Sequence, residues 1–368
     1  MNQPPPFWQA LFAANQPDGA AVVTMRLLKK RGKPLLLLPS QPKQATRALE
    51  LYPAQTPRSR LARLAARWLL KLRLPLGMDS VRVNLSPDDP FVCWLAQLAN
   101  LKPNQIPQFA VLAGNPNSPG QRLILLIFDS AGQPAAVVKV GLAEAARKLI
   151  IVEQEFLKSV PQSFPRIPVL RGTFANTRLQ AMALDYLPGR SPVESDEHRL
   201  PQVLSQWLHP QQQVEFSDTR VGRELASHCA THPLFKLHAP ALQGRCCRAA
   251  VYHGDFAPWN IRVAPGGDWM VLDWERGEVN GLPTWDWFHY EIQKAILVQH
   301  KSADSLARMV EAILTRDAFK TYVQASGVAG HERALLQLYL LHHAEVVRPS
   351  EGLQVTHDLM QLLAARWR

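Results

Sequence analysis

Hydrophobic and polar positions divide the chain after residue 105 into a part with strand patterns and a longer part with helix patterns. Short apolar runs bounded by Gly, Pro, Asn and Asp predict strands at 109–112, 122–128 and 135–140. The run 179–187, which ends before Pro188 and Gly189, predicts an edge strand followed by a turn. Helical spacing predicts helices at 143–159, 286–300, 303–326 (ended by Gly327), 334–346 and 351–367. The pattern indicates an α+β protein with a small β-rich lobe over 105–187 and a larger, mainly helical lobe over 188–368.

Residues 1–104 form an N-terminal extension without a recognisable motif. Residues 20–28 and 34–38 can pair as a hairpin, and 44–51 has helical spacing. The segment 58–73 predicts a basic amphipathic helix. One face carries Leu61, Leu64, Trp68 and Leu72, and cations recur at Arg60, Arg63, Arg67 and Lys71.

Two interpretations of the helix at 58–73 remain open. The favoured one packs the leucine face on the core and leaves the arginines in water. In the other, the helix lies on an anionic membrane surface or binds an acidic partner. Nucleic acid is not expected as a partner, because no recognition motif accompanies the charge.

Net charge is concentrated at the N-terminal end. The chain has a formal net charge of +11. Residues 1–100 contain 14 Lys or Arg and 5 Asp or Glu, a net charge of +9, whereas residues 101–368 contain 27 and 25, a net charge of +2. The basic character is therefore a property of the extension, and it concerns partners rather than fold.

Composition favours a cytoplasmic protein. No apolar run reaches the roughly 18 residues of a membrane span, and the N-terminus lacks the pattern of a secretory signal. The four cysteines, Cys93, Cys229, Cys246 and Cys247, have no metal-site spacing, and neighbouring cysteines rarely bridge each other. A reduced, cytoplasmic chain is the simplest interpretation.

Three polar residues in the helical part have the spacing of a phosphoryl-transfer site. Asp255 follows His253 and Gly254, Asn260 comes five residues after Asp255, and Asp273 follows a short predicted hairpin. A carboxylate can orient a hydroxyl nucleophile and accept its proton, while a second carboxylate and an amide oxygen are ligands that Mg²⁺ prefers. A carboxylate from a separate strand would hold the metal from a second side.

The segment His-Gly-Asp-x-x-x-x-Asn, followed by hydrophobic-Asp-Trp-Glu, resembles the aminoglycoside phosphotransferase and choline kinase-like family. The resemblance implies a two-lobed protein kinase-like fold. It also implies Asp255 as catalytic base and Asn260 and Asp273 as Mg²⁺ ligands, with Glu275 as a weaker candidate. Asp286, within Gly-x-Pro-x-x-Asp, is expected to anchor structure rather than to react.

The predicted β-rich lobe offers candidate nucleotide-binding residues. Its third strand carries Lys139, which can reach the α- and β-phosphates, and the glycine-bearing loop 113–120 can contact phosphates through backbone N–H groups. On the following helix Glu153 is the first choice as the partner of Lys139, and Glu155 is the reserve. The resemblance places the hinge that meets adenine at Asp185, Tyr186 and Leu187.

Together these features lead to the hypothesis of a Mg²⁺- and ATP-dependent kinase that phosphorylates a hydroxyl group of a small molecule. The main alternative is a non-catalytic, pseudokinase-like protein that binds ATP and docks to a membrane or partner through its basic extension. A further alternative keeps the fold but transfers a nucleotidyl group or uses a protein acceptor. Sugars, amino-alcohols and aminoglycoside-like compounds are all compatible with the sequence as acceptors.

Overall fold

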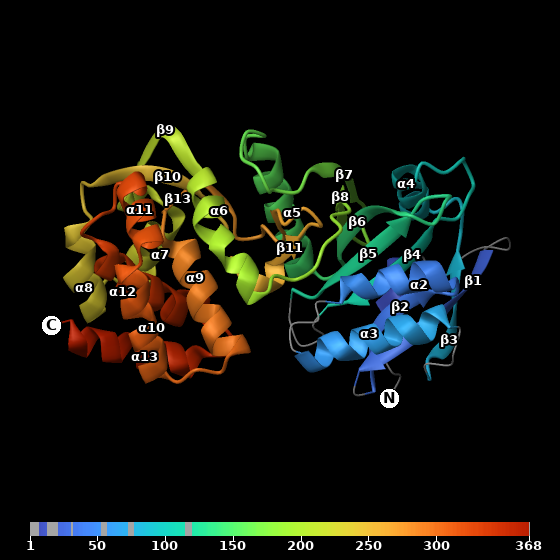
Figure 1. The fold of residues 1–368 in the computed structure, drawn as a ribbon. Coiled ribbons are helices and arrows are strands. Elements are labelled where there is room, and N and C mark those ends of the chain that lie inside the picture. Colours follow the sequence, from blue (N-terminus) through green and yellow to red (C-terminus); the bar gives the residue numbers. More distant parts are fainter. Residues whose placement is uncertain are drawn as a thin grey trace, which may run out of the picture. The chain divides into compact units, whose positions relative to one another are not determined.

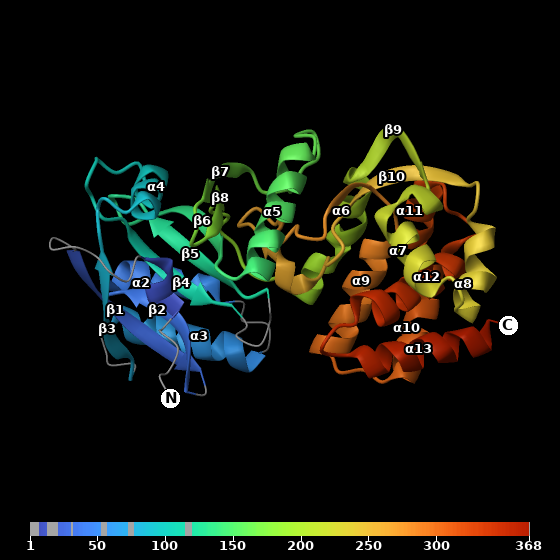
Figure 2. The same cartoon turned by 180° about the vertical axis from the view of Figure 1, so that it is seen from behind.

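The chain forms two compact units in a computed structural model, drawn in Figure 1 and from behind in Figure 2. The structure describes residues 7–12, 21–30, 32–52, 57–72, 77–114 and 120–367. The units consist of Met1–Lys158 with Pro168–Pro188 (unit 1) and of Ser159–Ile167 with Gly189–Arg368 (unit 2). The chain passes from unit 1 to unit 2 for the last time between Pro188 and Gly189, directly after the predicted hinge.

Unit 1 is built on one antiparallel eight-stranded sheet with the strand order β3-β1-β2-β4-β5-β6-β8-β7. The strands are β1 (Ala21–Lys30), β2 (Lys33–Pro39), β3 (Asp79–Leu85), β4 (Gln108–Ala113), β5 (Arg122–Phe128), β6 (Pro134–Gly141), β7 (Leu170–Ala175) and β8 (Gln180–Asp185). The predicted hairpin of the extension is confirmed, because β1 pairs with β2. The strands of the extension thus continue the sheet of the β-rich lobe.

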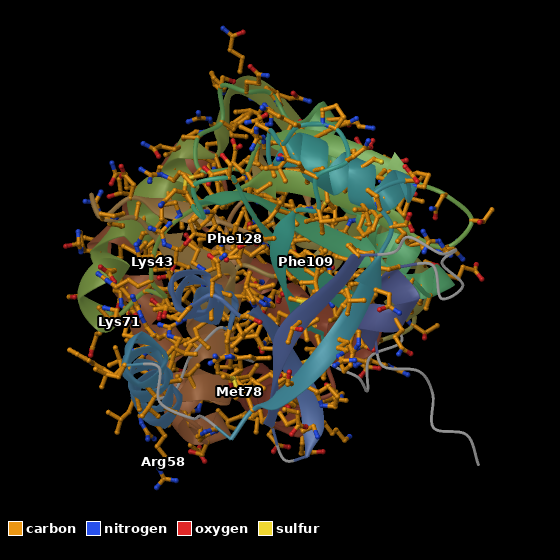
Figure 3. All side chains as sticks on the ribbon, turned by 90° about the vertical axis from the view of Figure 1, so that its right-hand side faces the viewer. Lys43, Arg58, Lys71, Met78, Phe109 and Phe128 are labelled. Atoms are coloured by element: carbon orange, nitrogen blue, oxygen red, sulfur yellow. The ribbon has the colours of Figure 1, made fainter. Side chains whose placement is uncertain are left out.

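Side chains alternate between the two faces of this sheet, as the period of a strand requires. On β5, Leu125 and Ile127 join one buried cluster, whereas Leu126 and Phe128 join the cluster on the other face. Helices α1 (Phe7–Leu11) and α4 (Pro90–Leu98) contribute to the first cluster. Helices α2 (Pro42–Ala48) and α3 (Pro57–Lys71) contribute to the second. In Figure 3, the labelled Phe109 belongs to the first cluster and Met78 to the second.

The favoured interpretation of the basic helix is wrong. Helix α3 is present, but it contacts the sheet side of unit 1 through Ala66 and Leu70, of which Leu70 is fully buried. The leucine face points to solvent. Leu61, Leu64, Trp68 and Leu72 are 69%, 51%, 64% and 61% exposed. The amphipathic pattern correctly predicted a helix, but the packing contacts come from the smaller opposite face.

Unit 2 is mainly helical, with a small sheet of order β13-β10-β9 and a two-stranded hairpin. Its helices are α6 (Leu200–Gln206), α7 (Arg220–Cys229), α8 (Pro233–His238), α9 (Trp285–Gln293), α10 (Ala303–Thr315), α11 (Asp317–Ser326), α12 (Glu332–His342) and α13 (Leu353–Arg366). Its strands are β9 (Leu208–Glu215), β10 (Cys246–Tyr252), β11 (Ile261–Val263), β12 (Trp269–Val271) and β13 (Glu278–Gly281). All nine residues of α9 are buried, so this helix is the centre of the unit.

The single helix predicted over 303–326 is two helices. The backbone of Arg316 is extended (φ −65°, ψ 134°) between α10 and α11, and its guanidinium lies 2.7 Å from a carboxylate oxygen of the buried Glu291. Gly327 ends α11 in the left-handed conformation, as predicted (φ +78°).

All four cysteines, Cys246 and Cys247 among them, are free thiols. Among the residues that the structure describes, no helix has the length and apolar character that crossing a membrane requires.

Candidate active site

Strand β10 leads directly into the loop that carries the predicted catalytic residues. Gly254 has φ +77°, a conformation that favours glycine. A Cβ atom at this position would lie 2.8 Å from Cβ of Arg276 and 2.9 Å from its carbonyl oxygen. The glycine before Asp255 is therefore required both by the backbone conformation and by the close approach of the segment at Arg276.

The Asp255 carboxylate is held at both oxygens. His289 Nε2 lies 3.0 Å from Oδ1, and Asn260 Nδ2 donates to Oδ2 at 2.9 Å and to the main-chain oxygen of Asp255 at 2.9 Å. Burial is the largest single influence and raises the pKa of Asp255, but the hydrogen bond from His289 and the nearby positive charge, including that of Arg276, together outweigh it, so the pKa of the carboxyl lies below its ordinary value. Asp255 is thus an oriented, ionised carboxylate.

Asn260 and Asp273 flank the same end of the hairpin formed by β11 and β12. Ile261 pairs with Val271, and the Leu272 amide donates to the Asn260 carbonyl at 2.7 Å. The side-chain nitrogen of Asn260 is directed to Asp255, so its amide oxygen points away from that residue. Asp273 has φ +74°, a left-handed conformation that non-glycine residues rarely adopt outside special sites. The predicted hairpin therefore brings the two oxygen donors to one end of a ladder.

His253 holds the loop in place through both nitrogens of a neutral imidazole. Its Nδ1 accepts from the Asp255 amide at 3.1 Å, which leaves Nε2 to donate to the Leu272 carbonyl at 2.8 Å. The ring is fully buried, and burial lowers its pKa to about 4. A second proton would occupy Nδ1 and remove the acceptor of the Asp255 amide. Neutral His253 thus ties the Asp255 loop to the strand end before Asp273.

Asp286, at the start of α9, anchors this loop. Its two carboxylate oxygens accept from the amides of His253 at 2.7 Å and Gly254 at 3.0 Å. Burial raises the pKa of Asp286 to about 7, and the two amides counteract that rise. The prediction that Asp286 is a structural anchor is confirmed by these bonds.

The sequence did not predict a role for His289, a residue of α9 that bonds to the Asp255 carboxylate. Its other nitrogen, Nδ1, lies 3.1 Å from the hydroxyl of Tyr339 on α12. With the tyrosine hydroxyl donating to Nδ1, Nε2 carries the proton that bonds to Asp255. One signal was available: His289 is three residues after Asp286, hence one helical turn along the face that meets the loop.

In unit 1, the predicted partner of Lys139 is confirmed. Lys139 Nζ lies 2.6 and 2.8 Å from the two carboxylate oxygens of Glu153, and both side chains are buried. Helix α5 (Glu144–Ser159) presents Glu153 on its buried face, whereas Glu155 is exposed on the other side. The ion pair links the middle of β6 to α5.

The remaining candidate positions of unit 1 are placed only in part. Asp185 ends β8 and pairs with Arg171 at 3.5 Å, and the Tyr186 hydroxyl donates to Glu50 at 2.6 Å. Leu187 is half-buried in the segment that leads to unit 2. Of the predicted phosphate loop, residues 115–119 lie outside those that the structure describes.

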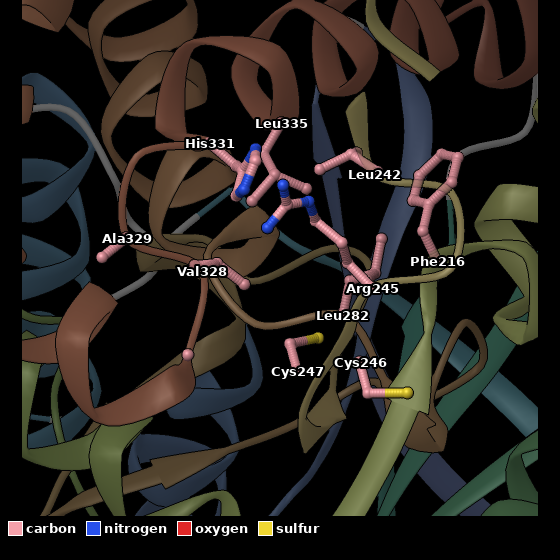
Figure 4. A pocket seen from close by; sticks show the side chains of 11 residues that line it. Phe216, Leu242, Arg245, Cys246, Cys247, Leu282, Val328, Ala329, His331 and Leu335 are labelled. Carbon is pink, nitrogen blue, oxygen red and sulfur yellow. The ribbon is translucent and has the colours of Figure 1, made fainter. Parts of the chain in front are cut away.

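A cavity of about 300 Å³ in unit 2 lies at the opposite end of β10 from Asp255 (Figure 4). Arg245, Cys246, Cys247 and His331 line it together with apolar side chains. Burial raises the pKa of the Cys247 thiol to about 12, which makes it inert at neutral pH. None of the predicted site residues lines this cavity.

No family model and no curated protein matches the sequence. Several solved structures are similar to this chain. A candidate fructosamine-3-kinase from Haemophilus somnus is 15% identical, with 74% of this chain and 96% of that chain covered and a TM-score of 0.46. An aminoglycoside phosphotransferase in complex with ADP and hygromycin B is 12% identical (74% and 97% covered, TM-score 0.46). A choline kinase from Streptococcus pneumoniae is 12% identical (66% and 89% covered, TM-score 0.38).

The order of the elements agrees with the expected protein kinase-like fold. A β-rich unit with a buried Lys–Glu pair precedes a helical unit that carries the loop 253–260 and the hairpin before Asp273. With identities of 12–15% and TM-scores below 0.5, these similarities carry no argument about this chain, so its activity has to be argued from its own residues.

The neutral state of His253 predicts a pH-dependent contribution to stability. The unfolded imidazole takes up a proton near pH 6.5, whereas the folded one does so only near pH 4. Stability from this group is therefore present above pH 6.5 and is lost as the pH falls toward 4, by up to about 3 kcal/mol. We expect the difference in unfolding free energy between wild type and His253→Gln to shrink by that order between pH 7 and pH 4.5. Urea unfolding followed by tryptophan fluorescence measures it, and a constant difference would contradict the neutral assignment.

The Lys139–Glu153 pair predicts strong non-additivity. Glu153→Leu leaves a buried ammonium without its partner, and we expect a loss of about 3 kcal/mol in unfolding free energy. Lys139→Met together with Glu153→Leu removes both charges and should recover at least half of that loss. Urea denaturation followed by circular dichroism gives the cycle, with Glu155→Leu as the matched exposed control. A double variant as unstable as the sum of the single ones would contradict a coupled buried pair.

Proposed function

We propose that the chain is an ATP-dependent phosphotransferase that moves the γ-phosphate to a hydroxyl group of a small molecule. The observation that carries the proposal is the Asp255 carboxylate, bonded at both oxygens, at a loop that also positions Asn260 beside the hairpin leading to Asp273. Binding alone does not require a buried network that orients one carboxylate. For this reason we favour catalysis over a pseudokinase-like role.

In this mechanism Asp255 orients the acceptor hydroxyl and takes its proton as the oxygen attacks the phosphorus. Phosphoryl transfer depends mainly on positioning, so a carboxylate with fixed direction contributes more than a mobile one. Asn260 and His289 supply that direction from two sides. The bond between the transferred phosphorus and the leaving oxygen of ADP breaks as the new ester forms.

Asn260 and Asp273 fit a Mg²⁺ site, because they offer an amide and a carboxylate oxygen at one end of the hairpin. When bound, Mg²⁺ would neutralise negative charge on the phosphate oxygens. Lys139, held straight by Glu153, would bind phosphate oxygens of ATP, and the backbone of Asp185, Tyr186 and Leu187 would meet adenine. These assignments follow from the resemblance and from the pairing in unit 1.

The acceptor is proposed at the level of chemical class. Solved relatives include structures with hygromycin B and streptomycin, and the similar proteins include a choline kinase. A panel of sugars, amino-alcohols and aminoglycosides with γ-labelled ATP therefore covers the acceptor classes of the proposal.

Replacing Asp255 with Asn tests the base directly. We expect Asp255→Asn to lower phosphate transfer to any acceptor found in the panel by at least about 10²-fold, because the amide cannot take the proton. ATP binding should persist, whereas the unfolding midpoint should fall slightly, because the amide offers one acceptor oxygen to the two donors Asn260 and His289. Asp317→Asn, an exposed aspartate at the start of α11, is the matched control and should keep wild-type transfer. Full transfer by Asp255→Asn would overturn the assignment.

His289 is expected to position Asp255 and to set its pKa. In His289→Gln the carboxylate loses its imidazole partner, so its pKa rises and the acid limb of the pH–kcat profile moves to higher pH. We expect kcat to fall about 10- to 100-fold at neutral pH while KM for ATP changes less than about threefold. His331→Gln, which alters a histidine at the cavity of Figure 4, is the control. An unmoved acid limb would show that His289 is merely structural.

A further inference from the structure

Helix α3 exposes a continuous apolar stripe to solvent. Ten large apolar side chains are exposed among the residues that the structure describes. Three of them, Leu61, Leu64 and Trp68, lie on this one helix, and a fourth, Leu72, follows its last residue with its amide bonded to the Trp68 carbonyl at 3.0 Å. Single exposed apolar residues are normal on protein surfaces, but a group on one face marks an interaction site. The proposed phosphotransferase chemistry makes no use of this stripe.

The stripe is not the face by which the helix packs on unit 1, because the opposite face makes those packing contacts. At 100° per residue the four side chains fall within an arc of about 80°. Ala66 and Leu70 lie roughly opposite and face the buried cluster with α2. Arg63 Nη1 donates to the Tyr52 carbonyl at 3.1 Å, which adds a polar tie on the attached side. The orientation of the helix therefore directs the leucines and the tryptophan outward.

Cations border the stripe and almost no acids accompany them. The helix contains five, Arg58, Arg60, Arg63, Arg67 and Lys71, and the sequence has no Asp or Glu between residues 51 and 78. Arg58 and Lys71 are exposed near its two ends, where Figure 3 labels them. The nearby Glu50 is already engaged by Arg67 at 3.7 Å and by the Tyr186 hydroxyl at 2.6 Å. The face thus combines apolar surface with positive charge that the protein neutralises only in part.

We propose that α3 is a membrane-surface anchor that lies in the interface of an anionic lipid bilayer. A helix of 15 residues is about 22 Å long, too short to span, and its charges exclude a buried orientation. A convex apolar stripe suits acyl chains, which adapt to any shape. A tryptophan at its centre suits the headgroup boundary, and flanking cations suit lipid phosphates. A purely acidic surface would complement the charge, whereas an anionic bilayer also covers the four apolar side chains.

Vesicle sedimentation of the full chain tests the anchor. We expect wild type to sediment with vesicles containing about 30 mol% phosphatidylserine, and to bind phosphatidylcholine vesicles at least about tenfold more weakly. The paired substitutions Leu61→Gln and Trp68→Gln should weaken binding to the anionic vesicles by at least about tenfold. Ile151→Gln with Val152→Gln, two exposed apolar residues on α5, is the matched control and should bind like wild type.

Two further measurements separate lipid from the alternatives. The Trp emission of wild type should shift to shorter wavelength on addition of anionic vesicles, and Trp68→Phe should abolish the shift while sedimentation persists.

The anchor is overturned if wild type fails to bind anionic vesicles, or if the α3 pair and the α5 pair bind equally. Binding to polyglutamate without binding to vesicles would identify an acidic protein surface as the partner. A wild-type dimer that the α3 pair converts to monomers, again without vesicle binding, would identify a second copy of the chain. Either outcome refutes the membrane proposal.

Discussion

The double hydrogen bond from the His253 and Gly254 amides to Asp286 is the interaction on which the candidate site depends. It fastens the loop at Asp255 to the first turn of α9, a helix with every residue buried. A buried carboxylate without partners would be costly, so the loop and the helix stabilise each other. One turn later the same helix delivers His289 to the Asp255 carboxylate. The direction of the proposed catalytic base is thus set by the core of unit 2 rather than by a surface loop.

This arrangement explains why so many polar groups lie inside unit 2. Along α9, Asp286 bonds to the loop, His289 to Asp255, Glu291 to Arg316 and Gln293 to His343. A satisfied buried network gives rigidity at a site whose chemistry demands position, whereas each partner left alone would destabilise the fold. The strained backbone of Asp273 is consistent with the same priority of position over local stability.

Sequence reasoning could predict what depends on local spacing. The hairpin before Asp273, the Lys139–Glu153 pair and the anchoring by Asp286 all follow from short segments with specific residue types. It missed His289, since contact with Asp255 requires α9 to pack across the loop. The prediction for α3 buried the wrong face, because an amphipathic pattern identifies two faces but not the one that packs on the core. In the structure Ala66 and Leu70 pack against the buried cluster, whereas the larger apolar stripe is exposed. The break at Arg316 was also invisible, since the apolar spacing continues across it while Glu291 binds the guanidinium.

The central claim is the proposal that this chain is a phosphotransferase that depends on Mg²⁺ and ATP. Calorimetric titration of the wild-type chain with ATP, once in excess Mg²⁺ and once in EDTA, tests it most directly. The account predicts one ATP site per chain, with binding at least about tenfold tighter in Mg²⁺ because the metal bridges the phosphates to oxygen ligands of the protein. Absence of binding in both solutions, or equal affinity with and without Mg²⁺, would contradict it.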